Sequence, residues 1–110
     1  MDGLIQENRR YARAGRSLQL RYRDFKNAGA VPLGSLTTDV GEGGVAFDSD
    51  KFLRLESRFV MEVSLPEVSG TVKAISKVAW IKRLAGANGY RVGSNFVWMS
   101  RGDKERLAGL

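Results

Sequence analysis

The chain has neither cysteine nor histidine among its 110 residues. Without cysteine it can form no disulfide, thiol nucleophile or thiolate metal site, which agrees with a reducing compartment. Without histidine it can build no Ser-His-Asp triad, histidine-ligated zinc site or imidazole general base. The 12 acidic residues are scattered, with no obvious pair in a shared apolar setting. We therefore expect a binding protein rather than an enzyme, without a metal or a cofactor.

Long apolar runs are also missing. No run approaches the ~20 residues that a membrane-spanning helix needs, and the N-terminus lacks the apolar core of a signal peptide. We expect a cytoplasmic protein with no membrane partner. A length of 110 residues with 43% hydrophobic side chains fits one domain with one modest core.

Positive charge is concentrated near the N-terminus. The formal net charge is +6, and residues 9–26 contain seven Arg and Lys against Asp24 alone. This local excess favours a phosphate-bearing partner. From residue 27 onward, 11 basic residues face 9 acidic ones. Because an extended basic groove is absent there, a nucleic acid polymer is the weaker alternative.

Alternating apolar and polar residues predict six strands, in residues 16–25, 34–40, 45–47, 58–65, 71–84 and 90–99. Both faces of the fifth segment are partly apolar, which indicates a bulge in a closing sheet. Ser100 is a candidate cap for a short C-terminal helix, with Asp103 at its third position and Leu107 and Leu110 as apolar anchors.

These strands predict a mostly β fold, a six-stranded antiparallel β-barrel with a short C-terminal helix. Residues 1–15 lack strand alternation. We expect them to form a flexible arginine-rich arm, with the barrel and helix in residues 16–110.

A glycine turn lies between the second and third expected strands, in Asp39-Val40-Gly41-Glu42-Gly43-Gly44. It fits neither a phosphate loop nor a dinucleotide fingerprint, because no Lys-Ser/Thr pair follows and a strand comes next. The simplest interpretation is a hairpin whose glycines supply positive φ. A turn without side chains also lets a ligand approach backbone N–H groups, which can hold an anion.

The arm contains Arg9, Arg10 and Arg13 within five residues. A solvated basic tail is one interpretation. Arginine is also the side chain suited to bidentate phosphate contacts and to stacking on planar rings. The arm could therefore wrap a planar anionic ligand.

The two tryptophans, Trp80 and Trp98, are expected to pack in the core, as most tryptophans on strands do. Trp80 differs in its sequence context, because Lys77, Lys82 and Arg83 surround it. An indole that is half-exposed beside cations is also a candidate stacking surface for a base.

The order of these elements resembles the PilZ domain family, small β-barrel receptors for the bacterial second messenger cyclic di-GMP. The family pattern is Arg-x-x-x-Arg on an N-terminal arm and then Asp/Asn-x-Ser-x-x-Gly after the second strand. Here the two motifs are Arg9-Arg10-Tyr11-Ala12-Arg13 and Asp39-Val40-Gly41-Glu42-Gly43-Gly44. The closing Tyr90-Arg91-Val92-Gly93 strand and the helix after Ser100 extend the likeness over nearly the whole chain.

The resemblance implies a cyclic di-GMP site. In it, Arg9 and Arg13 clamp phosphates and guanine edges, Arg10 adds charge or stacking, and Asp39 accepts from guanine N–H groups. Gly41 and Gly44 permit close backbone approach, and Trp80 is a candidate stacking surface. Ordering of the arm is then expected to signal to a protein partner or adjacent domain.

Gly41 departs from the family pattern, which has serine there. The missing hydroxyl removes a hydrogen bond worth roughly 1.5–3 kcal/mol, or about 10- to 150-fold in affinity. This leaves an alternative, a divergent PilZ domain that acts as a protein-interaction adaptor without binding nucleotide. The intact arginine arm favours the receptor.

Overall fold

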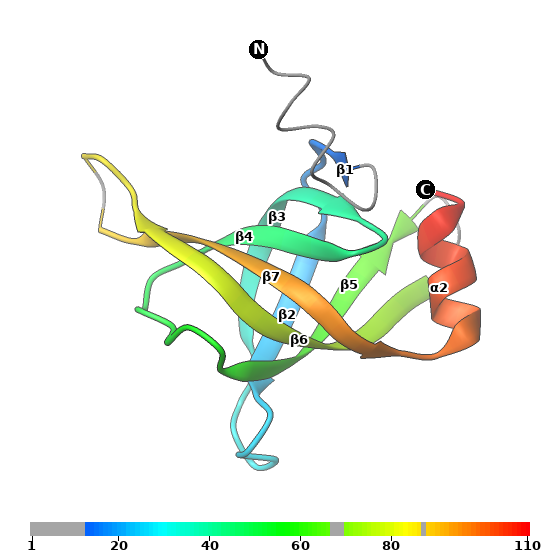
Figure 1. The fold of residues 1–110 in the computed structure, drawn as a ribbon, viewed down its shortest axis with the longest axis horizontal. Helices are drawn as coiled ribbons and strands as arrows, with labels where there is room; N and C mark the ends of the chain where they lie inside the picture. Colours follow the sequence, from blue (N-terminus) through cyan, green and yellow to red (C-terminus); the bar gives the residue numbers. More distant parts are fainter. Residues whose placement is uncertain (1–12, 67–69, 87) are drawn as a thin grey trace.

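The computed structural model describes residues 13–66, 70–86 and 88–110, and only the backbone of residues 13 and 14. Six antiparallel strands form a barrel: β2 (Gln19–Asp24), β3 (Leu33–Gly41), β4 (Gly44–Ser49), β5 (Arg58–Leu65), β6 (Gly70–Arg83) and β7 (Tyr90–Met99). They follow the order β3-β2-β5-β6-β7-β4, and pairing of β3 with β4 closes the sheet (Figure 1). The expected six-stranded barrel is confirmed.

Two short elements flank the barrel. β1 (Arg13–Ala14) pairs with the end of β3, at Val40 and Gly41. α2 (Arg101–Ala108) begins after Ser100, whose side chain accepts from the Asp103 N–H as expected. Asp103 also accepts from the Lys73 N–H at 3.0 Å, which fastens the helix to β6. None of the described helical residues form a segment with the length and hydropathy of a membrane span.

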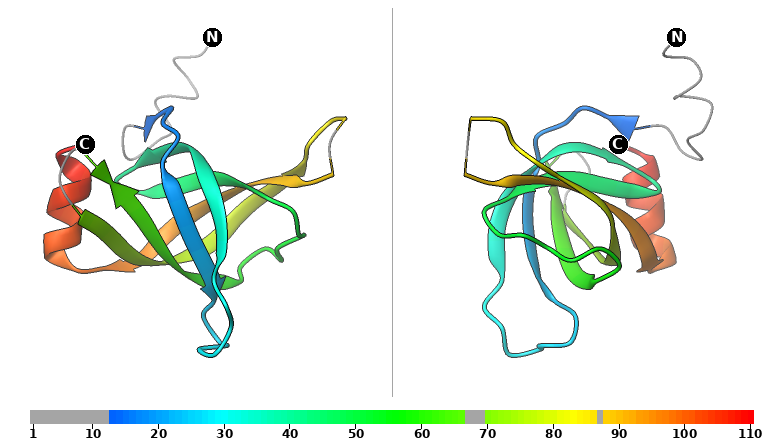
Figure 2. Two further views of the ribbon diagram at one scale, coloured as in Figure 1. Left: turned by 180° about the vertical axis from the view of Figure 1, so that it is seen from behind. Right: turned by 60° about the vertical axis from the view of Figure 1, so that its left-hand side comes forward.

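The helix and the longest hairpin lie at opposite ends of the barrel. The β6–β7 hairpin projects beyond the barrel, away from α2, in both views of Figure 2. The β3–β4 turn lies at the α2 end in Figures 1 and 2. β1 lies beside the same part of β3, so the chain segment that leaves the expected arm enters the fold next to this turn.

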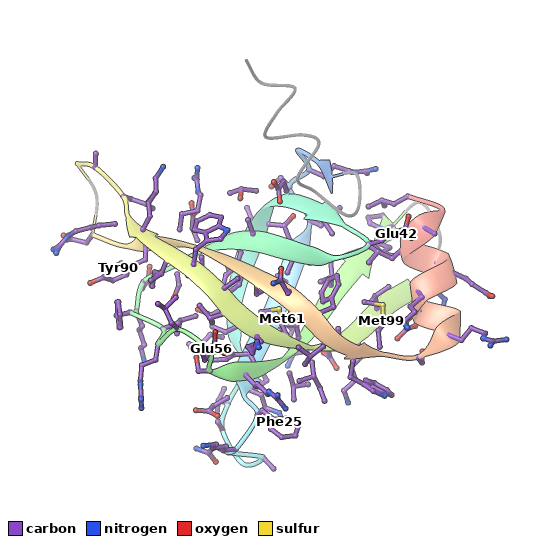
Figure 3. The ribbon with its side chains drawn as sticks, viewed as in Figure 1. Phe25, Glu42, Glu56, Met61, Tyr90 and Met99 are labelled. Atoms are coloured by element: carbon purple, nitrogen blue, oxygen red, sulfur yellow. The ribbon has the colours of Figure 1, made fainter. Side chains whose placement is uncertain are left out.

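Alternate residues of every strand fill the barrel interior. Phe47, Leu20, Met61 and Val92 are almost completely buried, and the Tyr22 ring packs against Phe47 with centroids 5.0 Å apart. Figure 3 shows Met61 within the barrel and Met99 nearer to α2. Leu107 of the helix joins the same core, as the sequence predicted, and Leu110 packs against it.

Both tryptophans lie on the outer face, so the expectation that they pack in the core is wrong. Trp80 is 39% exposed and Trp98 is 55% exposed. The register shifts between Val78 and Trp80 on β6, and at Val97 on β7. Each bulge inserts one residue, which moves the tryptophan after it from the inward to the outward parity.

Candidate functional site

The β3–β4 turn is short, because β3 ends at Gly41 and β4 begins at Gly44. Among the described glycines, only Gly70 and Gly86 have positive φ. The expectation that the turn glycines supply positive φ is therefore wrong. Gly44 has a different requirement, because a Cβ there would overlap the carbonyl oxygen of Ser94 on β7. Glycine at this position allows β4 and β7 to approach closely.

Thr37 holds the segment before β2 against β3. Its buried hydroxyl donates to the Arg16 carbonyl at 2.5 Å and accepts from the Leu18 N–H at 2.8 Å. This places β1 at the far end of β3, where Arg13 pairs with Gly41. The backbone of the last arginine of the arm motif thus runs beside the glycine turn. The predicted site residues Arg9 and Arg10 lie outside the described residues.

Asp39 reaches the outer face through a bulge of its own. Thr37 pairs with Phe47 and Asp39 pairs with Ala46, so Thr38 is the extra residue. Thr37 and Phe47 are buried, while Asp39 is only partly buried. The bulge therefore turns the Asp39 side chain toward the outer face, where neighbouring atoms cover its Oδ1 atom.

One lateral row of residues connects Asp39 with Trp80 across four strands. Asp39 on β3 pairs with Ala46 on β4, Ala46 pairs with Gly93 on β7, and Gly93 pairs with Trp80 on β6. Directly paired residues of antiparallel strands share a face. We call Asp39, Ala46, Gly93 and Trp80 the platform row. Three strand spacings separate its ends, which amounts to about 14 Å.

The middle of the platform row carries almost no side-chain bulk. A Cβ built on Gly93 would overlap the Trp80 indole at Cε2 and Nε1, so the ring lies directly on the Gly93 backbone. Ala46 adds only a methyl group between Gly93 and Asp39. The row therefore has a carboxylate at one end and, at the other, an indole that covers Gly93, while Ala46 between them is only 3% exposed.

Buried serines support the strands beneath the platform row. The Ser94 hydroxyl lies 3.2 Å from the Ser76 hydroxyl and 3.1 Å from the Val45 carbonyl oxygen. These contacts connect β4, β6 and β7 on the inner side of the sheet, with Val45 and Ser94 next to the row. Each such hydrogen bond contributes roughly 0.5–1.5 kcal/mol. They connect three of the four strands that carry the row.

Cationic side chains lie beside the platform row on the same face. The next outward row contains Lys82, paired with Arg91, which pairs with Asp48. Arg91 donates from Nε to Oδ1 of Asp48 at 2.8 Å and from Nη2 to Oδ2 at 3.2 Å. These hydrogen bonds, and the charge of Asp48, raise the pKa of Arg91 above its ordinary value. Asp48 thus fixes the Arg91 guanidinium next to the platform.

Most of the predicted site residues that the structure describes lie on or beside the platform row. Asp39 and Trp80 share the platform row, Gly41 follows Asp39 by two residues, and Arg13 pairs with Gly41. Gly44 lies on the same turn. Within the described part of the chain, no cluster of His, Cys, Asp and Glu could hold a metal ion.

Sequence reasoning missed Ala46, Gly93 and the Arg91–Asp48 pair as parts of this face. Gly93 carried a usable signal, because glycine inside an apolar strand often marks a close approach of another group. The sequence around Ala46 and Asp48 contains no such signal. Their position depends on the register between β4 and β7, which no local pattern specifies.

Comparison with known proteins identifies the fold family. A family model described as the PilZ domain matches residues 7–110. The chain belongs to the PilZ domain family. No curated protein matches the chain.

Several solved PilZ structures share its fold. The inhibitor of motility MotI/DgrA of Bacillus subtilis is 15% identical with a TM-score of 0.79, covering 93% of this chain and 48% of MotI. The PilZ domain of YcgR from Escherichia coli, solved with c-di-GMP, is 21% identical with a TM-score of 0.67, covering 91% of this chain and 86% of that domain. A MrkH–c-di-GMP complex from K. pneumonia is 19% identical with a TM-score of 0.68, covering 93% of this chain and 50% of the MrkH chain. The chain thus spans about half the length of MotI and MrkH.

Proposed function

We propose that this PilZ domain binds cyclic di-GMP on the platform row and beside the β3–β4 turn. One observation carries the proposal: separate bulges turn Asp39 and Trp80 onto one face of one row, and Arg13 pairs with Gly41 at the Asp39 end. The backbone of Arg13, the last residue of the arginine motif, thus lies beside the glycine motif, and the nearby outer face has an acceptor, a stacking ring and cations, which supports the proposal. YcgR and MrkH, which share the fold, were solved with c-di-GMP.

Each side chain has a role that its chemistry supports. The Asp39 carboxylate accepts hydrogen bonds from guanine N–H donors, and the Trp80 indole stacks on a base. Arg9 and Arg13 grip phosphate and guanine acceptors with their planar guanidinium groups, and Arg10 adds charge or stacking. Gly41 leaves the turn without a side chain, so that the ligand reaches the backbone, and Gly44 lets β4 lie close to β7 beside it. No bond is made or broken, and the proposed role is that of a receptor in the cytoplasm.

The proposed output is ordering of the N-terminal arm. A ligand held between Asp39 and the arm arginines couples residues 1–15 to the barrel, since Arg13 already pairs with β3. Binding then changes the surface that a partner or neighbouring domain meets. Amide hydrogen exchange of residues 1–15, with and without cyclic di-GMP, tests this step. We expect slower exchange with ligand, and unchanged exchange in these residues contradicts it.

Calorimetric titration tests the binding itself. We expect heat of binding with cyclic di-GMP at submillimolar concentration and none with GMP, which has one base and one phosphate. Absence of heat with cyclic di-GMP rejects the receptor proposal for this chain.

The adaptor remains a second candidate because of Gly41. Gly41 follows Asp39 by two residues on β3, so a serine there would project to the same face as Asp39. The chain therefore lacks a serine hydroxyl next to the Asp39 end of the platform row. An adaptor predicts no response to cyclic di-GMP even in Gly41→Ser, whereas a weakened receptor predicts a gain of affinity in that variant.

A further inference from the structure

A second row of outward-facing residues crosses β2, β5, β6 and β7. Arg23 pairs with Val60, Val60 pairs with Ile75, and Ile75 pairs with Trp98. Val60 and Ile75 are partly exposed, and Trp98 is 55% exposed. We call Val60, Ile75 and Trp98 the apolar row. The bulge residue Val97, 43% exposed, widens it at the Trp98 end.

Basic side chains surround the apolar row on the neighbouring outward positions. Arg58 and Lys77 pair with each other on one side, and Arg21, Glu62 and Lys73 follow one another in register on the other. Among the described residues, the carboxylates here are Glu62, 3.9 Å from Arg21, Glu56, 3.4 Å from Lys77, and Asp103, which accepts from the Lys73 N–H. The cations that border the row are Arg21, Arg23, Arg58, Lys73 and Lys77. They outnumber these three carboxylates, so the described rim carries an excess of positive charge.

The composition of this surface is that of a protein-binding site. Tryptophan and arginine are enriched at the energetic centres of interfaces, and an indole flanked by aliphatic side chains offers an apolar contact area. A nucleic acid would place polar sugar and phosphate groups against Val60, Ile75 and Val97. Contacts between those polar groups and aliphatic side chains add little to the affinity. A second copy of this chain would bring two basic rims together, and like charges oppose that contact.

We propose that the apolar row and its basic rim bind an acidic protein segment, which inserts an aromatic or large aliphatic side chain against Trp98. The negative charges of the segment pair with the rim, while its apolar residue covers the row. The inference deepens the proposed function by assigning a surface for the partner, yet it does not require nucleotide. β6 and β7 carry both surfaces, because Ile75 and Trp80 share one strand and Gly93 and Trp98 share the other.

Selection from a random 16-residue peptide library displayed on phage, with the full chain as target, tests this assignment. We expect the recovered peptides to be net negative and to contain an aromatic or large aliphatic residue. Trp98→Ala should weaken their affinity at least about tenfold, as loss of an interface hot spot does. The double variant Arg23→Glu/Arg58→Glu, which keeps Trp98 and changes one partly exposed and one exposed side chain, should weaken it similarly.

Phe52→Ala is the matched control, because Phe52 is 59% exposed but lies in the segment between β4 and β5. It should leave peptide affinity unchanged. Failure to recover any peptide, or recovery of peptides that bind Trp98→Ala as well as the parent, overturns the assignment. Binding of a 20-nucleotide oligo(dT) that depends on Trp98, without such peptides, overturns it in favour of nucleic acid.

Cyclic di-GMP titration of the same variants separates the two proposals. Trp98→Ala should retain the parent's nucleotide affinity while losing the peptides, which supports a separate partner surface. Loss of nucleotide affinity in Trp98→Ala, with the fold intact by circular dichroism, contradicts that separation. A parent chain that binds the acidic peptides through Trp98 but not cyclic di-GMP rejects the proposed function and retains this inference.

Discussion

Trp80 and Trp98 lie on opposite strands of the same β6–β7 hairpin, and both reach the outer face through a bulge. Their partners across the ladder differ. Trp80 pairs with Gly93 and its ring lies on the glycine backbone, whereas Trp98 pairs with the β-branched Ile75. The first indole is accordingly the less exposed of the two, at 39% against 55%.

This difference distinguishes two kinds of exposed aromatic surface. A glycine partner lets the indole lie against the sheet backbone, and the same row ends in the Asp39 carboxylate. Such a surface suits a planar, hydrogen-bonding ligand. An isoleucine partner extends the apolar area instead, and the charges around it are mostly positive. That surface suits an acidic protein segment.

The largest expected effect comes from the arm. Arg13→Ala should lower cyclic di-GMP affinity at least about 100-fold, because it removes a guanidinium that makes bidentate, charge-assisted hydrogen bonds. Arg101→Ala on the exposed surface of α2 is the matched control and should have no effect. Calorimetry measures both. Equal affinities for the two variants would remove the arm from the site.

Gly41→Ser should strengthen cyclic di-GMP binding by at least about tenfold, because it restores a hydroxyl on the Asp39 face. Gly34→Ser is the control on the same strand, where a Cβ would meet no atom within 4 Å. It should leave the affinity unchanged. An unchanged affinity in Gly41→Ser itself would show that the missing hydroxyl has no bearing on binding.

Gly93→Ala should displace the Trp80 indole and weaken cyclic di-GMP binding about fivefold or more, since stacking of a base contributes ~1–3 kcal/mol. The Trp98 peptides should bind as before. Gly34→Ala serves as control, because its methyl group projects into open space. If Gly93→Ala shifts the fluorescence of Trp80 but not the affinity, the indole is no part of the nucleotide site.

Tyr22→Phe tests the barrel core apart from either surface, and its expected effect is the smallest. It removes the 3.0 Å hydrogen bond with Ser49 and should lower the free energy of unfolding by about 0.5–1.5 kcal/mol. Both ligand affinities should stay unchanged. Urea unfolding followed by circular dichroism measures the effect, and an altered cyclic di-GMP affinity would show that core and platform are coupled.

Tyr22 gives the parent protein a predicted pH dependence, which the Phe variant tests. Burial, assisted by the charge of Asp50 and opposed by the hydrogen bond with Ser49, raises the pKa of Tyr22 above its ordinary value. Above pH ~10 the unfolded state therefore ionises Tyr22 before the folded state does. The stability that Tyr22 adds should be fully present below pH ~10 and should fall as the pH rises further. The Phe variant should lack this contribution to the fall, and equal slopes for the two proteins would contradict the buried, neutral phenol.

Much of the fold could be predicted because its local signals are strong. Residues 58–65 and 90–99 are strands with the bounds that the sequence predicts, since alternation runs through each of them. Ser100 and Asp103 begin the helix as expected, because capping depends on residues that are neighbours in the chain. The strand predicted for residues 34–40 is β3, and it is one residue longer at each end. Leu33 pairs with a residue of β2, and Gly41 pairs with a residue of β1.

The sequence could not predict which proposed site residues point outward from the barrel, because a bulge reverses the inward and outward alternation of the residues after it. By parity alone Trp80 belongs with the buried Val78, and Asp39 belongs with the buried Thr37. One extra residue before each reverses that assignment. A bulge depends on register with a neighbouring strand, and a single sequence does not specify that register. The motifs therefore pointed to Asp39 and Arg13 as candidates, while the positions of Ala46 and Gly93 between Asp39 and Trp80 required the fold.

The most direct measurement of the central claim is an NMR titration of the ¹⁵N-labelled chain with cyclic di-GMP, followed at its two indole N–H signals. Trp80 and Trp98 contribute one signal each, assigned from the Trp80→Phe and Trp98→Phe variants. The platform row predicts that the Trp80 signal shifts and saturates with the ligand while the Trp98 signal stays in place. Saturable shifts at Trp98 alone, or at neither indole, would contradict the platform row as the cyclic di-GMP site.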